Sequence, residues 1–290
     1  MIVKESIKLD PGLYFVATPI GAARDITLRA MDVLRDADIL VAEDTRTLRK
    51  LMDIHSISLK GRKIISYNDH NGTSKRPFII SEIALGKSVS YSSEAGSPLV
   101  ADPGYQLGRE VSESGYRVVT VPGACAVIAA LTVSGLPTNQ FFYAGFLPNS
   151  KSARQKFLTL VENIPGTLVF YESPKRLNKA LIDMLFILGP ERPVVIAREL
   201  TKKFEETIRS TLGEINEKIE GRAIKGEIVI LIGKKPETVF NLEDLHKILL
   251  VELSENSLKD TVLKVAMRTG VARSLVYKAA LEINNISRVS

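Results

Sequence analysis

The fold is decided by the stretch Leu13-Tyr14-Phe15-Val16-Ala17-Thr18-Pro19-Ile20-Gly21, in which an apolar run ends in a loop that contains proline and glycine. Unbroken apolar runs of this length are typical of strands that are buried on both faces. Helically spaced apolar residues separate this run from similar ones, which indicates a mostly parallel α/β sheet covered on both faces. The first strand is expected at Leu13–Thr18, and the others at Ile39–Ala42, Lys63–Tyr67, Ser88–Ser92 and Arg117–Val121.

The chain has 290 residues, more than one typical domain, so further domains are expected. We predict an N-terminal α/β domain over residues 1–122, a second α/β domain over residues 123–236 and a helical extension over residues 237–290. The second domain is expected to hold five more strands, at Phe141–Gly145, Thr167–Tyr171, Val194–Arg198, Thr207–Ser210 and Glu227–Gly233.

Composition excludes several classes of protein. Hydrophobic residues make up 45% of the chain and charged residues 25%, which is ordinary for a globular protein and unlike a disordered one. No apolar run reaches the roughly 18 residues of a membrane span, so no membrane association is expected. The single cysteine, Cys125, cannot form an internal disulfide, and a reducing cytoplasm is the expected location. Because His55, His70 and Cys125 are not at ligand spacing, no metal is expected.

The C-terminal tail carries most of the net charge of +6, because six basic and two acidic residues lie between Lys259 and the C-terminus. Asp260 is expected to cap one short helix, and a second helix, Ala272–Ile283, is expected to turn Leu275, Val276, Ala279 and Ala280 inward. Two short helices across a turn match a helix-turn-helix, although a hairpin that only packs against the body has the same pattern. Clustered charge favours nucleic acid, with these predicted RNA contacts: Lys264, Arg268, Arg273 and Lys278.

Loops that follow three strands of the first domain together carry four carboxylates, all of them in the loops after the second and fourth strands. Glu43 and Asp44 follow the second strand, whereas Glu94 and Asp102 belong to the loop after the fourth, and Arg46 is the one cation among them. In an open α/β sheet, ligands bind at the carboxyl ends of the strands. Carboxylates at such an edge suit a cationic ligand or ribose hydroxyls, although Asp44 and Asp102 could each simply cap a helix. The chain has neither a G-x-G-x-x-G nor a Walker loop, which disfavours a nucleotide phosphate site.

Seven short strings, taken in order, resemble the tetrapyrrole methylase superfamily of S-adenosylmethionine-dependent enzymes, and in particular its RNA-modifying branch. The resemblance runs from about Gly12 to Gly233. The strings are Val16-Ala17-Thr18-Pro19-Ile20-Gly21, Ala42-Glu43-Asp44-Thr45-Arg46, Ala95-Gly96-Ser97-Pro98 with Asp102-Pro103-Gly104, Val121-Pro122-Gly123-Ala124-Cys125-Ala126, Gly145-Phe146-Leu147-Pro148, Phe170-Tyr171-Glu172-Ser173-Pro174 and Arg198-Glu199-Leu200-Thr201-Lys202.

The resemblance implies a two-lobed class III methyltransferase fold, a homodimer and a bound S-adenosylmethionine in the cleft between the lobes. Most residues at the implied contact positions are small or apolar and offer backbone groups, and Cys125 would be a wall residue rather than a nucleophile. The implied cofactor contacts are Pro19, Ala95, Gly96, Ser97, Val100, Cys125, Ala126, Tyr171, Glu172 and Leu200.

The branch that the chain resembles methylates a cytidine 2′-oxygen in 16S ribosomal RNA, and the substrate would be that RNA or the assembled small subunit. Polar side chains beside the cleft are the candidate catalytic residues, namely Lys202, Glu199, Glu205 and Asp44, with Arg46 as a further RNA contact. Two other functions share these features: a methylase of small corrin-like molecules, and a non-catalytic RNA-binding factor. The basic tail disfavours the first of these, and the loops built of small residues disfavour the second.

Overall fold

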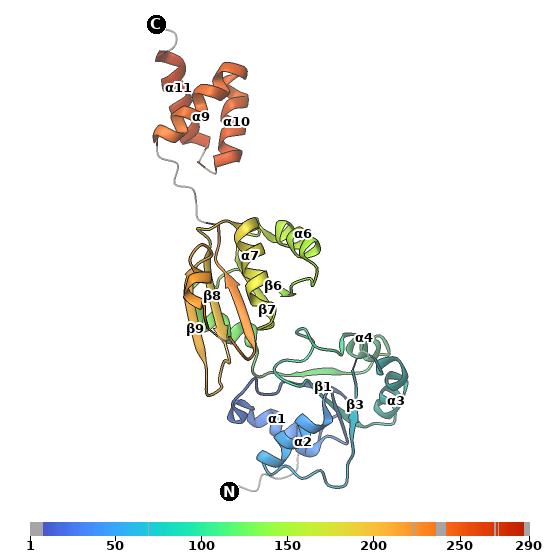
Figure 1. Cartoon of the computed structure of the whole chain (residues 1–290). Helices are drawn as coiled ribbons and strands as arrows, with labels where there is room; N and C mark the ends of the chain where they lie inside the picture. Colours follow the sequence, from blue (N-terminus) through green and yellow to red (C-terminus); the bar gives the residue numbers. More distant parts are fainter. Residues whose placement is uncertain are drawn as a thin grey trace. The chain divides into compact units, whose positions relative to one another are not determined.

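A computed structural model describes residues 8–68, 70–222, 224–235, 242–269, 271 and 273–286. The chain divides into two compact units, Met1–Lys234 and Lys235–Ser290, the first of which holds two sheets (Figure 1). Within the described ranges, no helix combines the length and the apolar character that crossing a bilayer requires.

The first sheet has five strands in the order β3-β2-β4-β1-β5, and every neighbouring pair is parallel. The predicted parallel sheet is therefore confirmed, although β3 is shorter than the sequence indicated. β1 and β4 are central and completely buried, as their apolar and small side chains require. The strands are β1 (Gly12–Val16), β2 (Ile39–Ala42), β3 (Ile64–Ser66), β4 (Ser88–Ser92) and β5 (Val118–Val121).

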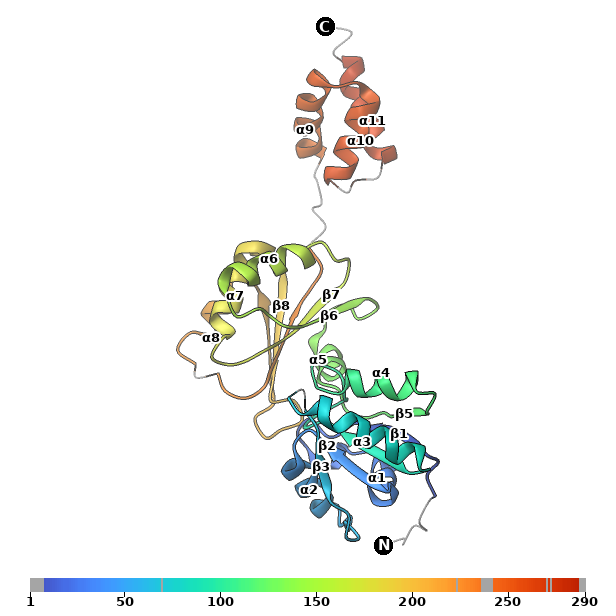
Figure 2. The same cartoon turned by 90° about the vertical axis from the view of Figure 1, so that its right-hand side faces the viewer.

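Helices cover both faces of this sheet, each with its own apolar cluster (Figure 2). On one face pack α1 (Leu28–Asp36) and α2 (Thr45–Ile54), and on the other α3 (Gly72–Ala84) and α4 (Tyr105–Glu113). A short 3-10 helix, η1 (Ala23–Asp25), precedes α1. The Thr27 hydroxyl accepts a hydrogen bond from the Ala30 N–H, which caps α1 and starts the helix where the strand-to-helix loop ends.

The second sheet also has five strands, in the order β6-β7-β10-β8-β9, and the predicted strands are again found. Only β6 and β7 pair in parallel, while the other three pairs are antiparallel. One face packs against α6 (Lys151–Val161), α7 (Leu177–Leu188) and α8 (Ile215–Ile219). The strands are β6 (Phe141–Phe146), β7 (Thr167–Glu172), β8 (Pro193–Arg198), β9 (Glu206–Thr211) and β10 (Ile228–Ile232).

One small helix joins the two sheets through a shared apolar cluster. This helix, α5 (Ala126–Ser134), follows β5 and buries Val127, Ala130 and Leu131 against the other face of the second sheet. Ile20, from the loop after β1, and Leu200, from the turn after β8, belong to the same cluster. The loops at the carboxyl edge of the first sheet are thereby held against the second sheet.

In the second unit, the described residues form a bundle of three helices, α9 (Leu242–Glu255), α10 (Leu258–Thr269) and α11 (Arg273–Ile286), around one apolar cluster. Two predictions about this region are wrong. Asp260 lies inside α10, and Ser257 caps that helix by accepting the Asp260 N–H at 3.3 Å. Leu275 is 59% exposed, whereas the other predicted inward residues of this helix, Val276, Ala279 and Ala280, are buried as expected. Gly270, in the predicted turn, and Ala272, the predicted start of the second helix, lie outside the described residues.

A buried ion pair joins α6 to α7 beneath the second sheet. The Arg154 Nε lies 2.7 Å from the Asp183 Oδ2, and the two side chains are 6% and 3% exposed. Asp183 also accepts a hydrogen bond from the Gln155 amide, so its charge is well compensated. A carboxylate left here without its guanidinium would be both desolvated and unpaired.

We therefore expect Arg154→Ala to lower the free energy of unfolding by about 3–5 kcal/mol, measured by urea denaturation. Arg109→Ala is the matched control, because its pair with Glu113 is more than half exposed and should be worth less than about 1 kcal/mol. Equal losses in the two variants would contradict the assignment of a buried, compensated pair.

Candidate functional site

Two loops at the carboxyl edge of the first sheet are tied to each other by backbone hydrogen bonds. The Thr18 N–H donates to the Gly96 carbonyl at 2.9 Å, and the Gly96 N–H donates to the Thr18 carbonyl at 3.1 Å. The Ser93 hydroxyl donates to the Gly96 carbonyl at 2.7 Å. Gly96 has a φ of 87°, a conformation that favours glycine, so this residue type is required at the contact.

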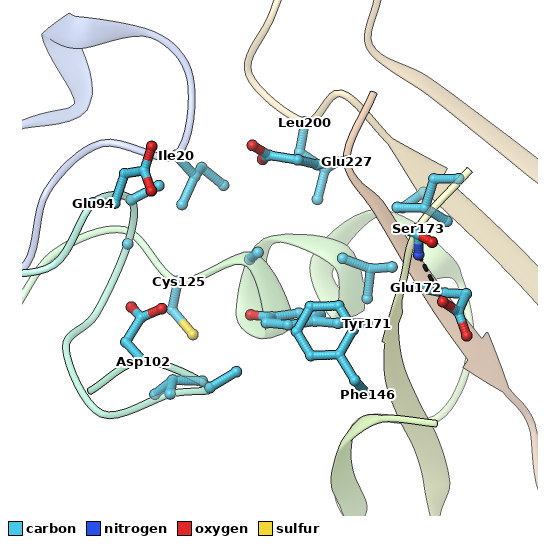
Figure 3. Close-up of a pocket in the computed structure, with 18 of the residues that line it drawn as sticks. Ile20, Glu94, Asp102, Cys125, Phe146, Tyr171, Glu172, Ser173, Leu200 and Glu227 are labelled. Carbon is cyan, nitrogen blue, oxygen red and sulfur yellow. Dashed lines mark hydrogen bonds between the residues drawn. The ribbon is translucent and has the colours of Figure 1, made fainter. Parts of the chain in front are cut away.

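A pocket of about 460 Å³ opens between these loops and the second sheet. Its walls come from the loop after β4, the start of α5, the end of β7, the turn after β8 and the start of β10. In Figure 3, Asp102 and Cys125 lie on one side of the pocket, Tyr171 and Phe146 on another, and Leu200 with Glu227 at a third. The Tyr171 and Phe146 rings meet edge to face with centroids 5.7 Å apart.

Nine of the ten predicted cofactor contacts line this pocket, and only Pro19 does not. The nine come from four separate segments of the chain, so the fold brings together residues that are distant in sequence. Their placement is a structural finding, whereas their contact with a cofactor stays a prediction. They are Ala95, Gly96, Ser97, Val100, Cys125, Ala126, Tyr171, Glu172 and Leu200.

The pocket is lined by five carboxylates, and none of the residues that line it is a lysine, arginine or histidine. Burial, together with the charges of Glu43 and Glu94, raises the pKa of Asp102 to about 7. The Asp102 Oδ2 is buried and has no hydrogen-bond partner in the described part of the chain. A cation in the pocket would relieve this electrostatic cost, whereas a phosphate would increase it.

Glu172 is the most deeply buried of these carboxylates, at 3% exposure. Its Oε1 accepts the Ser173 N–H at 2.7 Å and lies 3.2 Å from the Arg176 Nε. Burial nevertheless raises the pKa of Glu172. Its Oε2 finds no partner among the described residues, which leaves one acceptor free at the pocket wall.

Backbone strain is concentrated around the pocket. Six non-glycine residues in the described ranges have a positive φ, and four of them are in the two segments that flank the pocket: Leu99, Ala101, Glu199 and Thr201. Such conformations cost about 1–3 kcal/mol each and persist where the surrounding structure fixes them. At Gly21, an added Cβ would lie 2.5 Å from the Thr201 hydroxyl oxygen and 2.9 Å from the Leu200 carbonyl oxygen, so the loop after β1 packs tightly against the strained turn after β8.

None of the four candidate catalytic residues lines the pocket, and each has structural contacts. Asp44 caps α2 by accepting the Arg46 N–H at 2.7 Å, as the alternative reading of this residue expected. Asp102 does not cap α4, because Gly104 is the residue that precedes that helix. The Glu205 carboxylate accepts the Thr201 N–H at 2.6 Å. The catalytic roles of these residues stay predictions.

Lys202 and Glu199 form the contact nearest to the pocket. The Lys202 Nζ lies 3.1 Å from the Glu199 Oε1 and 3.2 Å from the Oε2 of the pocket residue Glu227. Burial by itself would lower the pKa of Lys202, but the hydrogen bonds and charges of the two glutamates outweigh it and raise that pKa. Hydrogen bonds, chiefly from the Glu227 N–H, lower the pKa of Glu199.

The predicted RNA contacts lie in two places. Arg46 is at the start of α2, with its side chain 91% exposed. Lys264, on α10, and Arg273 and Lys278, on α11, are exposed. The Arg268 side chain lies outside the described part of the structure. Their contact with RNA stays a prediction.

Sequence reasoning missed several pocket residues. Phe146, Ser173 and Pro174 stood in the strings that carried the resemblance, so a signal for them existed. Ala197 and the segment from Gly226 to Val229 carried none, because they reach the pocket only through the antiparallel pairing of β10 with β7 and β8.

Comparison with known proteins places this architecture in a family. A model of the Tetrapyrrole (Corrin/Porphyrin) Methylases matches residues 12–216. A protein named ribosomal RNA small subunit methyltransferase I from Mesorhizobium japonicum is 41% identical over 280 residues, 96% of this chain and 94% of that protein. The protein of the same name from Escherichia coli O157:H7 is 39% identical over 93% of this chain and 94% of its own length.

Solved structures share the fold at low sequence identity. A cobalt precorrin-4 methyltransferase has a TM-score of 0.57 and 18% identity, covering 76% of this chain and 94% of its own. The uroporphyrin-III C-methyltransferase of Thermus thermophilus, solved with bound S-adenosyl homocysteine, has a TM-score of 0.52 and 18% identity, covering 77% of this chain and 97% of its own. The match to the family model agrees with an identity of about 40% to these relatives over nearly the full length of the chain. The chain therefore belongs to the tetrapyrrole methylase family, and within it to the ribosomal RNA small subunit methyltransferase I proteins.

Proposed function

We propose that this protein transfers a methyl group from S-adenosylmethionine to the 2′-oxygen of a cytidine ribose in 16S ribosomal RNA. The observation that carries the proposal is the pocket, whose lining is rich in carboxylates, lacks cationic side chains and includes residues of the strings that resemble the family. Relatives at about 40% identity are named ribosomal RNA small subunit methyltransferase I. A solved structure with the same fold was determined with S-adenosyl homocysteine.

The residues present fit a positively charged nucleoside. Glu43, Glu94 and Asp102 would favour its charge, and the Tyr171 and Phe146 rings offer an aromatic wall. Small side chains such as those of Ala95 and Gly96 leave backbone groups open to the ligand. When bound, the cofactor would supply an activated methyl group on its sulfonium.

The chain's own contribution to the reaction is chiefly positioning. A ribose hydroxyl is a weak nucleophile, and alignment can supply about 7–11 kcal/mol in favourable intramolecular models. The Thr18 and Gly96 bridge and the strained turn after β8 hold the pocket walls rigidly for this purpose. Lys202, which sits between Glu199 and Glu227, would act as a fixed cation at the rim of the pocket rather than as a proton acceptor.

A homodimer in the cytoplasm is part of the same proposal. The rings of Phe141 and Phe142 are 44% and 38% exposed on β6, which is an edge strand of the second sheet. Exposed apolar surface at a sheet edge is typical of a surface that pairs with another chain.

The exposed cations of α10 and α11 support contact with RNA.

The reaction is tested with methyl-labelled S-adenosylmethionine and three acceptors: free 16S RNA, isolated small subunits and a tetrapyrrole. We expect one ribose methyl on a cytidine of the RNA, mapped by mass spectrometry, and no label in the tetrapyrrole. Label in the tetrapyrrole alone would show a small-molecule methylase. Cofactor binding without transfer to any acceptor would indicate a non-catalytic factor.

The charge of Asp102 should make cofactor binding depend on pH. Because its pKa is about 7, the carboxylate ionises between about pH 6 and pH 8, and we expect S-adenosylmethionine to bind about tenfold more tightly at pH 8 than at pH 6. S-adenosylhomocysteine has a neutral sulfur and should show a smaller change. Isothermal titration calorimetry measures both.

The variant Asp102→Asn should lose this pH dependence and bind S-adenosylmethionine no more tightly than the wild type does at pH 6. Asp25→Asn is the matched control, since Asp25 is exposed on η1 and away from the pocket lining. A wild-type affinity that stays constant from pH 6 to pH 8 would show that Asp102 does not contact the cationic part of the cofactor.

The raised pKa of Lys202 predicts modest effects of its substitution. A protonated lysine cannot accept the hydroxyl proton, so we expect Lys202→Ala to lower kcat by no more than about tenfold and Lys202→Arg to retain most activity. A general base typically contributes about 10²–10⁴-fold. A loss of a hundredfold or more in Lys202→Ala, with normal cofactor binding, would therefore assign Lys202 the proton transfer.

A further inference from the structure

A basic groove runs along α2 and the start of β3, on the first sheet. It has a volume of about 710 Å³, and its lining holds five cationic side chains against the single acid Asp53. Figure 2 shows α2 and β3 beside each other at the edge of this sheet. The cationic residues of this basic groove are Arg46, Arg49, Lys50, Arg62 and Lys63.

Three of these cations are available to a ligand. Arg46, Lys50 and Lys63 are exposed, and Lys50 and Lys63 form no ion pair within the described ranges. Arg46 only approaches the Asp44 carboxylate at 3.5 Å while its side chain stays 91% exposed. On α2, the spacing from Arg46 to Lys50 places both on one helical face.

The other two cations have structural partners. Arg62 donates to the backbone carbonyls of Leu59, Ala37 and Ser58, which holds the turn before β3, and burial lowers its pKa. Arg49 pairs with Asp53 at 3.4 Å on the exposed side of α2. The most exposed positive charge of the basic groove therefore belongs to Arg46, which also pairs with Asp44 at 3.5 Å, and to Lys50 and Lys63.

The basic groove begins where the pocket ends. Glu43 lines the pocket, whereas Thr45 and Arg46, two and three residues later, line the groove. The two neighbouring surfaces thus have opposite charge. A polyanion is attracted along the groove and repelled from the pocket, so its phosphates would stay outside while a neighbouring ribose reaches the pocket mouth.

We propose that the basic groove formed by α2 and the start of β3 binds the phosphate backbone of the RNA substrate and thereby brings a ribose to the pocket. This inference rests on the proposed function. The lining has no aromatic side chain, which disfavours stacking of unpaired bases, and its excess of cations suits a polyanion. The groove would therefore contribute affinity and register without reading the base sequence.

The test compares two triple variants that each remove three positive charges. Arg46→Ala/Lys50→Ala/Lys63→Ala changes the groove, and Lys151→Ala/Lys156→Ala/Lys179→Ala is the matched control. The control lysines are exposed on α6 and α7, away from the lining of the pocket and of the groove. The probe is free 16S RNA, and the Kd is measured at several salt concentrations.

The dependence of log Kd on log salt reports the number of phosphate contacts, at about 0.7–0.9 per contact. We expect the groove variant to lose about two to three units of that slope and on the order of a hundredfold in affinity at 0.1 M salt. The control variant should keep the wild-type slope. An unchanged slope in the groove variant, or an equal loss in the control, would overturn the inference.

Two further measurements separate this inference from the proposed function. Calorimetry should show that both triple variants bind S-adenosylmethionine as the wild type does, since the substituted residues do not line the pocket. Wild-type protein that methylates no RNA would refute the proposed function. Wild-type protein that methylates RNA, together with a groove variant that binds RNA normally, would refute only the groove.

Discussion

Two reciprocal hydrogen bonds between Thr18 and Gly96 join the loops that leave the neighbouring strands β1 and β4. Because both strands are buried and parallel, their carboxyl ends already lie at one edge, and the bridge converts that edge into a fixed wall. An added Cβ at Gly96 would lie 3.2 Å from the Ile20 Cγ2, and Ile20 packs into the cluster shared with the second sheet. The position of the pocket therefore depends on this one contact.

Charge divides the first sheet's edge into two surfaces of opposite sign. The pocket concentrates carboxylates in a partly buried space, which suits a cation and disfavours phosphate. The basic groove begins beyond Glu43, where the chain turns into α2 and Arg46 reaches solvent. A nucleic acid would contact both surfaces favourably only if its phosphate backbone lay in the basic groove and its reacting ribose lay at the pocket.

Much of this could be predicted from the sequence, because unbroken apolar runs such as Leu13–Val16 mark buried strands, and parallel strands share one functional edge. The carboxylates Glu43, Glu94 and Asp102 meet in the pocket for that reason. The order of the second sheet could not be predicted, since apolar periodicity identifies a strand but not its partner. Gly226 and Glu227 were missed as a consequence, because β10 reaches the pocket only through that order. Asp260 was misplaced by one helical turn, since both it and Ser257 are residue types that cap helices.

Cys125 immediately precedes α5 and lines the pocket as a partly buried residue. The chain contains one cysteine, so reagents that are specific for thiols have a single target on the whole polypeptide. Any molecule that fills the pocket would shield that sulfur. Cys125 therefore serves as an intrinsic footprinting label in the wild-type enzyme. The occupancy of the pocket can be followed through its reactivity, without attaching a dye or engineering a residue.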